Sequence, residues 1–387
     1  MTNVDILLHT QPGEKIRLVP DLCLLNDDLS HKMPQLGAEG MASALCQRTM
    51  VILDHDIPAG SFDTAFRQKA LIELSRKYDL PFVQAEGIGY ALLRRRYLQR
   101  GQLLLGWGDH VCAVGAVGAL GLQLTDNDLE HVLRTGWLDL TVPQRAALRF
   151  TGRLPDGVDI YDAAISLLPG LGQIYQNKLL MLVDSTEDGL DPDKRQVLCQ
   201  LLHRLGAVSA LFLSEEETVE ALGKETRLSE CSLSGAALSM VLPGCMTHIV
   251  PVAGQSPVKV DACFIGGCCG GHIAALRQAA NILRGKRIKR ELRLLVGFAD
   301  NEDYLCAMKE GLIEVFLDCG AQVTNPGCAS CRTTSIGVVG NGEAIASTGC
   351  YNFPGCCSTS ASRVYLASVE TVARAALSGF IQMEEEG

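Results

Sequence analysis

The sequence predicts an α/β protein that is built on parallel sheets. From about residue 255, segments with the pattern of strands alternate with segments with the pattern of helices, an order that favours right-handed crossovers within one sheet. The composition agrees, because 47% of the 387 residues are hydrophobic and 20% are charged, which is too apolar for a disordered chain. A chain of this length is expected to form two or three domains.

The alternation is clearest in the C-terminal third of the chain. In order, we predict a strand over 258–265, a loop over 266–271, a helix that ends at Leu283, a strand over 292–296, a helix between Asp300 and Gly311, and a strand over 313–317. Asp300 suits a helix N-cap, and a glycine such as Gly311 is common just after a helix. Ligands of parallel sheets bind beside the loops that follow strand carboxyl ends, and loop 266–271 lies at such a place.

The N-terminal part mixes strands and helices in the same way. We predict strands over 50–53 and 102–106, and helices over 62–79, from 191 to 205 and from 215 onward. The helix over 62–79 is expected to bury one apolar face, formed by Phe62, Phe66, Ala70, Leu71, Leu74 and Tyr78. The strand over 50–53 runs directly into Asp54 and His55, which places two ionisable side chains at its carboxyl end.

Charge and hydropathy exclude some classes of partner. The formal net charge of −10 argues against a nucleic-acid partner, and the short basic runs 94–96 and 286–290 are predicted to be solvated surface. A signal peptide would begin with basic residues followed by an apolar stretch, and the sequence does not begin in this way, so we expect none. The most apolar stretch, 103–124, is interrupted by Asp109 and His110, so we expect no membrane helix and a cytoplasmic protein.

The chain has 16 cysteines, and a cytoplasmic protein is not expected to pair them as disulfides. Most of them, such as Cys199 and Cys306, are predicted to be small core residues. The others gather in three short segments, over 264–271, 325–331 and 347–357.

Three of these clustered cysteines suggest a metal centre. Cys328 and Cys331 form a C-x-x-C turn, which brings two thiolates onto one centre, and one distant cysteine would add a third. Three thiolates are what a 4Fe–4S cluster needs when its fourth iron stays open to bind a leaving hydroxyl. A C-x-x-C turn is also compatible with a redox pair or with half of a zinc site. Further thiolates for zinc are available in Cys350, Cys356 and Cys357.

Short segments along most of the chain form an ordered set. They are Leu53-Asp54-His55, Gly87-Ile88-Gly89-Tyr90, Gly108-Asp109-His110, Glu130-His131-Val132-Leu133, Leu154-Pro155-Asp156-Gly157-Val158, Ile265-Gly266-Gly267-Cys268, Pro326-Gly327-Cys328-Ala329-Ser330-Cys331 and the run from Ser347 to Gly355. In this order they resemble the large subunits of aconitase and of isopropylmalate isomerase (3-isopropylmalate dehydratase). The common order, more than any single motif, identifies the chain as a divergent member of that family.

The resemblance implies a fold and a cofactor. The chain would form the three α/β domains of the aconitase large subunit, at 1–190, 191–250 and 251–387, without the family's swivel domain. Cys268, Cys328 and Cys331 would be the ligands of a 4Fe–4S cluster held by the third domain.

The resemblance also implies roles for other side chains. Asp54 with His55 would manage the proton of the leaving hydroxyl, and Asp109 with His110 would be a second such pair. The residues at substrate-binding positions of the family are Ser347, Tyr351 and Asn352. The histidines without such support, which we predict to be structural, are His131, His203 and His272.

The activity implied is that of a hydro-lyase, which adds or removes water on a small hydroxy acid through the open iron of the cluster. In the split enzymes of this family a small subunit supplies the swivel domain with the catalytic base. We therefore expect a small swivel-domain partner subunit, and an isolated chain without activity.

The chain departs from the family where the substrate would be held. Tyr351 and Cys356 stand at the places of two family arginines, and arginine forks are the usual way to hold carboxylates. Gln200 and Arg204 stand where the family has Asn-x-x-x-Glu. Two alternatives to a hydro-lyase stay open. One is a redox or regulatory protein whose cluster is closed by Cys350, Cys356 or Cys357, and the other is a structural relic that binds zinc.

Overall fold

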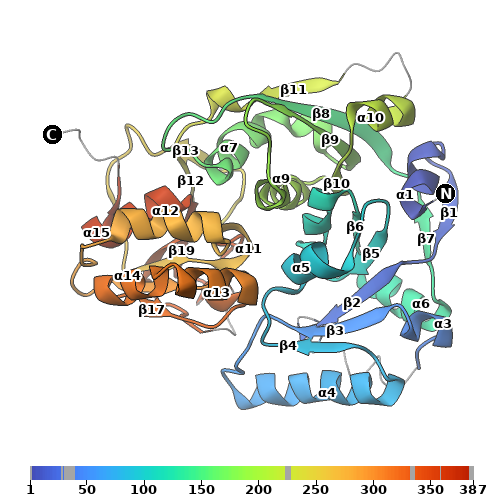
Figure 1. Cartoon of the computed structure of the whole chain (residues 1–387), viewed down its shortest axis with the longest axis horizontal. Helices are drawn as coiled ribbons and strands as arrows, with labels where there is room; N and C mark the ends of the chain where they lie inside the picture. The colour runs from blue at the N-terminus through green and yellow to red at the C-terminus, as the bar shows by residue number, and fades with distance from the viewer. Residues whose placement is uncertain are drawn as a thin grey trace.

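The computed structural model describes residues 2–27, 29, 40–222, 228–331, 336–357 and 359–382. Its strands form three main sheets, in the N-terminal, middle and C-terminal parts of the chain, as Figure 1 shows. Two short antiparallel pairs accompany them, β1 (Lys15–Leu18) with β7 (Leu138–Thr141) and β14 (Val258–Lys259) with β20 (Phe380–Ile381). The α/β class with parallel sheets is confirmed.

The N-terminal sheet is parallel throughout, in the order β4-β3-β2-β5-β6. Its strands are β2 (Leu22–Asn26), β3 (Thr49–Leu53), β4 (Phe82–Gln84), β5 (Leu103–Gly106) and β6 (Leu120–Gln123). Every residue of β3 is buried, because α4 (Phe62–Tyr78) covers one face of the sheet and α5 (Gly89–Leu92) the other. Asp27, Asp54 and the segment 107–110 follow β2, β3 and β5 and therefore share the carboxyl edge of the sheet.

The middle sheet is also parallel and has the order β10-β9-β8-β11. Its strands are β8 (Gln144–Gly152), β9 (Lys178–Thr186), β10 (Ser209–Phe212) and β11 (Ser229–Ser232). The crossover from β9 to β10 is helix α9 (Pro192–Arg204), which lies near the centre of the view in Figure 1. The sheet takes two strands from before residue 190 and two from after it; the division into three domains stays a prediction.

The C-terminal sheet has the order β13-β12-β19-β18-β15-β16-β17, and its last five strands are parallel. Its strands are β12 (Ser239–Val241), β13 (Ile249–Pro251), β15 (Ala262–Ile265), β16 (Arg293–Val296), β17 (Gln322–Val323), β18 (Ala344–Ser347) and β19 (Arg363–Ala367). Alternate strand residues pack against α12 to α15 on one face and, with the cysteine loops, against α7 and α9 on the other.

The remaining helices complete the layers. The α-helices are α1 (Asn3–His9), α3 (Ser43–Cys46), α6 (Asp126–Thr135), α7 (Ile160–Leu167), α8 (Gly172–Tyr175), α10 (Glu215–Leu222), α11 (Gly267–Gly270), α12 (Ile273–Leu283), α13 (Asn301–Lys309), α14 (Leu312–Cys319) and α15 (Val369–Ser378). The 3₁₀ turns are η3 (Val111–Val117), η4 (Leu168–Leu171), η5 (Leu233–Gly235) and η6 (Ala329–Cys331), and η2 (Leu93–Tyr97) is a π-helix. Within the described ranges, no helix is long and apolar enough to cross a membrane.

Several predicted elements are confirmed, and one is wrong. The strand over 50–53, the helix over 62–79 and the Asp300 N-cap are all present, and the Asp300 carboxylate accepts from two backbone N–H groups of α13. The segment 313–317, predicted as a strand, lies inside α14. Its buried residues Leu312, Val315, Phe316 and Cys319 recur at the helical spacing, and flanking glycines in left-handed conformation bracket the helix.

Two details of the N-terminal part also differ from the prediction. Helix α4 is rotated, so that Phe62 is 97% exposed and Phe66 73% exposed. Gln68 turns inward instead, where its amide donates to the carbonyl of Asp56 at 2.9 Å and to Asp27 at 3.3 Å. The basic run 94–96, predicted as solvated surface, has Arg94 buried, because its guanidinium binds Asp193 and Gln196 of α9.

Candidate active site and metal centre

Loops from the N-terminal and C-terminal sheets meet at the candidate site. The cysteine-bearing loops follow β15, β17 and β18, each at its carboxyl end. The backbone N–H of Cys328 donates to the carbonyl of Asp54 at 3.2 Å, and the Asn325 amide donates to the carbonyl of Ile57 at 2.7 Å. These contacts bring the predicted Asp54–His55 pair beside the predicted cysteine ligands, as the sequence pattern requires.

The sulfur atoms converge from different loops. The Cys350 Sγ lies 3.1 Å from the Cys268 Sγ and 3.3 Å from the Cys269 Sγ. The backbone N–H of Cys350 donates to the Cys331 Sγ at 3.4 Å, so Cys331 borders the same group. Cys328 packs against the apolar cluster that holds the others but is only half-buried. The predicted ligands Cys268, Cys328 and Cys331 therefore lie in one region, where the tightest group is Cys268, Cys269 and Cys350.

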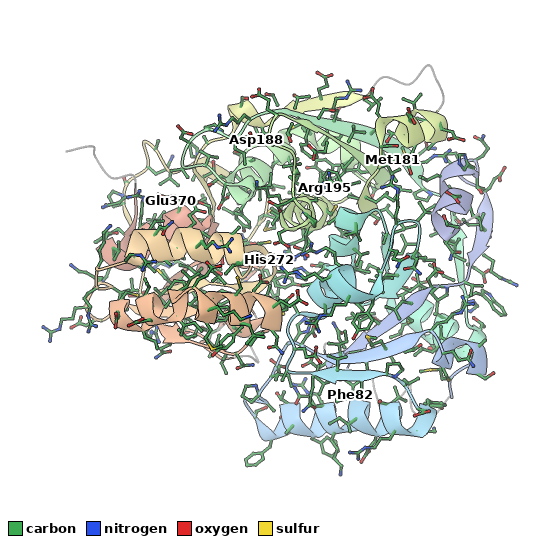
Figure 2. All side chains as sticks on the ribbon, in the orientation of Figure 1. Phe82, Met181, Asp188, Arg195, His272 and Glu370 are labelled. Carbon is green, nitrogen blue, oxygen red and sulfur yellow. The ribbon has the colours of Figure 1, made fainter. Side chains whose placement is uncertain are left out.

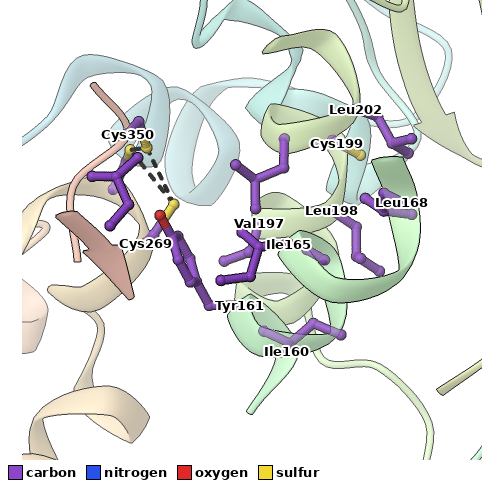
Figure 3. Close-up of a cluster of buried hydrophobic side chains, with 14 of the residues drawn as sticks. Ile160, Tyr161, Ile165, Leu168, Val197, Leu198, Cys199, Leu202, Cys269 and Cys350 are labelled. Carbon is purple, nitrogen blue, oxygen red and sulfur yellow. Dashed lines mark hydrogen bonds between the residues drawn. The ribbon is translucent and has the colours of Figure 1, made fainter. Parts of the chain in front are cut away.

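The backbone around Cys268 is held closely. Thr348 Oγ1 accepts from the N–H of Gly266 at 2.9 Å, and a Cβ added at Gly270 would lie 2.2 Å from that oxygen. Residue 270 must therefore be glycine for β15 and β18 to approach as they do. On the other side, the Tyr161 hydroxyl donates to the carbonyl of Gly349 at 3.0 Å, and Figure 3 shows its ring directed toward Cys269 and Cys350.

These residues fit a metal–sulfur cofactor. Thiolates are the ligands that iron–sulfur clusters use, and N–H donation to sulfur, as from Cys350 to Cys331, is a common way to tune such clusters. The donor atoms of His110, Cys268 and Cys350 also lie within 4.8 Å of one another, close enough to share one ion. All three are buried, which would shield a bound centre from solvent.

The Asp54–His55 pair is oriented by a third acid. The His55 Nδ1 lies 2.5 Å from the Asp54 Oδ1, and the other Asp54 oxygen accepts from the N–H of Gly89 at 2.7 Å. Asp27 accepts from the backbone N–H groups of Asp54, His55 and Asp56 at 3.0–3.3 Å. Asp27 was not predicted, because it follows β2 and meets the pair only through the parallel pairing of β2 with β3.

Burial and charge separate the two acids of this group. Burial raises the pKa of Asp54 to about 6, against the opposing effect of His55. Burial also opposes ionisation of Asp27, but the hydrogen bond and charge of His55 hold the pKa of Asp27 well below its usual range. Asp27 is therefore the permanent carboxylate, and Asp54 is the one that can take up a proton near neutral pH.

The predicted Asp109–His110 pair is arranged differently. The His110 Nε2 lies 3.1 Å from the Tyr351 hydroxyl, and the Nδ1 lies 3.5 Å from the Cys268 Sγ. Asp109 turns away and accepts from Arg204 at 2.7 Å. Burial lowers the pKa of His110, which favours the neutral imidazole beside the sulfur. His110 thus reaches the metal region while Asp109 serves Arg204.

The predicted substrate-binding residues separate into two kinds. The Ser347 Oγ accepts from the N–H of Gly349 at 2.9 Å, and the Asn352 amide donates to the carbonyl of Leu242 at 2.7 Å. Both side chains are buried and hold the loop after β18 in place. Tyr351 is the member of the set that faces other side chains, since its ring packs on His110 and lies 4.4 Å from the Arg204 guanidinium.

A buried ionic network supports the cysteine loop from behind. His272, predicted to be structural, lies where α12 and α13 approach α9 (Figure 2). Its Nε2 is 3.0 Å from the carbonyl of Cys268, and its Nδ1 is 3.4 Å from both Asp303 and Arg95. Gln196 of α9 donates to the same carbonyl at 3.0 Å. The sequence signal for this support was a set of polar residues four apart on α9, namely Gln196, Gln200 and Arg204.

Comparisons with known proteins show the family of the chain. The model described as "Aconitase family (aconitate hydratase)" matches residues 4–241 and 249–379, which is most of the chain. The chain belongs to the aconitase family. The resemblance stated from the motifs is therefore confirmed.

Aconitase-family relatives match the chain over most of its length. The 3-isopropylmalate dehydratase large subunit of Campylobacter curvus is 32% identical over 86% of this chain and 84% of its own length. The homoaconitase large subunit of Thermus thermophilus is 30% identical over 88% and 85%. Among solved structures, aconitase X of Thermococcus kodakaraensis in its holo-form has a TM-score of 0.56 at 13% identity, over 86% and 83%, which shows a shared fold. The names of the two relatives support a hydro-lyase function for this aconitase-family chain.

Proposed function

We propose that this chain is the large subunit of a hydro-lyase that acts on a small hydroxy acid, with a 4Fe–4S cluster on Cys268, Cys328 and Cys331. The observation that carries the proposal is the contact between Asp54 and Cys328, which joins a carboxylate–imidazole pair to the cysteine loops. When bound, such a cluster supplies an iron that can coordinate and polarise a leaving hydroxyl.

The protein's own residues would handle the proton and the site's shape. Asp54 and Asp27 both lie against the His55 Nδ1, and this imidazole would give a proton to the departing hydroxyl. Asp27 accepts from the backbone N–H of His55 and would hold the backbone of the pair in place. His110, held by Tyr351 beside the Cys268 sulfur, would orient the hydroxy acid.

A partner subunit is part of the proposal. The relatives that match over most of their length are named as large subunits, which supports a small swivel-domain partner that supplies the base for the α-proton.

The test is dehydration by the complex of this chain with its small partner. The anaerobically purified, iron-loaded complex is assayed with a panel of hydroxy acids for the absorbance of the unsaturated product. Because general acid–base groups contribute about 10²–10⁴-fold, His55→Ala should lower kcat by about that factor. His131→Ala is the matched control, since the half-buried His131 of α6 pairs with Asp139 and its replacement should leave kcat unchanged. No dehydration of any hydroxy acid by the loaded wild-type complex would contradict the proposal.

One observation favours a second candidate, a closed metal centre without hydro-lyase activity. Of the three extra thiols, Cys350 is the one whose sulfur touches Cys268, whereas the Cys356 Sγ donates to the carbonyl of Tyr351. Cys350 could complete four-thiolate ligation of a cluster, or share a zinc ion with His110 and Cys268. Zinc without iron after anaerobic purification, or a four-iron cluster indifferent to hydroxy acids, would support this candidate.

A further inference from the structure

Helix α9 carries a polar stripe toward the site. Gln196, Gln200 and Arg204 are four residues apart and so lie on one face, on a helix whose other buried residues are mostly apolar. Gln196 is fully engaged, because its amide donates to the carbonyl of Cys268 and its oxygen accepts from Arg94. The next two members of the stripe are not satisfied in this way.

Gln200 and Arg204 each keep a buried donor free. Gln200 is fully buried and its oxygen accepts from the Cys269 Sγ at 3.8 Å, but its Nε2 has no hydrogen-bond partner among the described residues. Arg204 has an 8% exposed side chain, donates from Nη1 to Asp109 at 2.7 Å, and likewise has a partnerless buried Nε. A buried donor without an acceptor is costly, and a ligand oxygen would remove that cost.

Short contacts link this pair of donors to the metal region. The Arg204 guanidinium lies 4.4 Å from the Tyr351 ring, the Tyr351 hydroxyl is 3.1 Å from His110, and His110 is 3.5 Å from the Cys268 Sγ. The Arg204 guanidinium of α9 is therefore linked to the cysteine loops through Tyr351 and His110.

We infer that Arg204, aided by Gln200, is the anchor for a carboxylate of the substrate. Asp109 holds one edge of the guanidinium, and the Nε–Nη2 edge is the fork that a carboxylate accepts in two parallel hydrogen bonds. The substrate class is then a hydroxy acid whose carboxylate binds α9 while its hydroxyl faces the cysteine loops. The inference rests on the proposed function for the location of that hydroxyl.

The same helix offers a matched control. Arg195 also pairs with an aspartate, Asp184 at 3.0 Å, also lies over an aromatic ring, Phe212 at 4.9 Å, and also has a partnerless buried Nε. Its partners belong to the middle sheet and not to the cysteine loops, and it is labelled in Figure 2. If replacing Arg204 changes ligand binding and replacing Arg195 does not, the change is specific to the site and is not a general effect of losing a buried arginine.

The experiment measures binding of lactate, and of lactamide, which lacks the carboxylate, to the full chain with its partner by ligand-observed NMR. Wild type should bind lactate at least tenfold more tightly than lactamide. Arg204→Gln should weaken lactate binding by about ten- to hundredfold, as expected for lost charge-assisted bonds. Arg204→Lys, which keeps the charge but not the fork, should fall between, and Arg195→Gln should match wild type. Circular dichroism melting checks that each variant is folded.

Equal lactate affinity in wild type and a folded Arg204→Gln, or no preference for lactate over lactamide, would overturn the inference. So would a wild-type complex that binds neither. The experiment distinguishes failure of this inference from failure of the proposed function. Arg204-dependent lactate binding without an iron cluster would contradict the proposed function alone, and an intact labile-iron cluster with Arg204-independent binding would contradict the inference alone.

Discussion

Asp27 controls the geometry of the Asp54–His55 pair more directly than any residue that the motif contains. Its carboxylate accepts hydrogen bonds from three consecutive backbone N–H groups just after β3. It therefore sets the direction in which the Asp54 and His55 side chains leave the strand. If an amide replaced this carboxylate, its NH2 group, a donor, would face one of these backbone N–H donors.

We predict that Asp27→Asn lowers kcat at least tenfold and destabilises the fold by about 1–3 kcal/mol, because buried N–H groups lose their acceptor. Asp21→Asn is the control at the other end of β2, where Asp21 accepts from the N–H of Leu103 at 2.8 Å. Both variants should lose stability in urea unfolding, but only Asp27→Asn should lose activity. Equal kcat values for the two variants would contradict a positioning role for Asp27.

At the residue scale, site residues that are neighbours in the sequence could be predicted, and those brought together by folding could not. Asp54 and His55 were predictable because one strand end carries both. Asp27 and Arg204 reach the site from β2 and α9, by pairing and packing across long stretches of chain. The pairing of Asp109 with Arg204 likewise depends on how α9 packs against η3, which no local pattern encodes.

At the element scale, apolar runs were assigned correctly where strand and helix patterns differ. The run over 313–317 was ambiguous, since five mostly apolar residues suit either element, and the glycines on both sides permit the helix that forms. On α4 the apolar spacing was helical, but the buried face was set by Gln68, whose amide bonds to the site loop. Polar residues that bind a neighbouring loop override the apolar stripe.

Helix α7 carries a pH-sensitive element at its first turn. Asp159 caps the helix, and Asp162 accepts from the N–H of Ser239 at 3.2 Å. Burial, with a further contribution from the Asp159 charge, raises the pKa of Asp162 to about 8. The folded chain therefore holds a proton there that the unfolded chain releases near the usual aspartate range.

This difference predicts the sign of a stability change. Between about pH 4 and about pH 8 the folded state binds more protons at Asp162 than the unfolded state, so the free energy of unfolding should fall as pH rises. Asp162→Asn should flatten that slope in urea unfolding series, whereas the exposed control Asp156→Asn should keep it. A slope that is equally steep in Asp162→Asn would contradict this account.

At the scale of the whole molecule, the site exists because the three sheets are joined around it. Arg95 lies on η2, between β4 and β5 of the N-terminal sheet. Its guanidinium contacts Asp300 at 2.7 Å and Asp303 at 3.1 Å in the C-terminal part, and Asp193 of α9 at 3.4 Å. The family resemblance predicted the overall architecture. The ion pairs of Arg95 were not predicted, because the basic run 94–96 has the composition of solvated surface.

We predict that Arg95→Leu destabilises the chain by about 3–5 kcal/mol, because Asp300 and Asp303 are almost fully buried and would lose their counter-charge. The neighbouring Arg96→Leu removes pairs with Glu86 and Glu302, which are 40% and 56% exposed, and should cost less than about 1 kcal/mol. Chemical unfolding of both variants checks the difference, and equal losses would show that the ion pairs of Arg95 are not what joins the parts.

The measurement that tests the central claim most directly is metal analysis with EPR of the anaerobically purified complex after mild oxidation. An open fourth iron, held by Cys268, Cys328 and Cys331, predicts the signal of a three-iron cluster formed by loss of one labile iron, and a change in the reduced spectrum on adding a hydroxy acid. A four-iron cluster that keeps all its iron would contradict the account and point to Cys350 as a fourth ligand. The absence of iron, under conditions that load a control protein, would contradict it entirely.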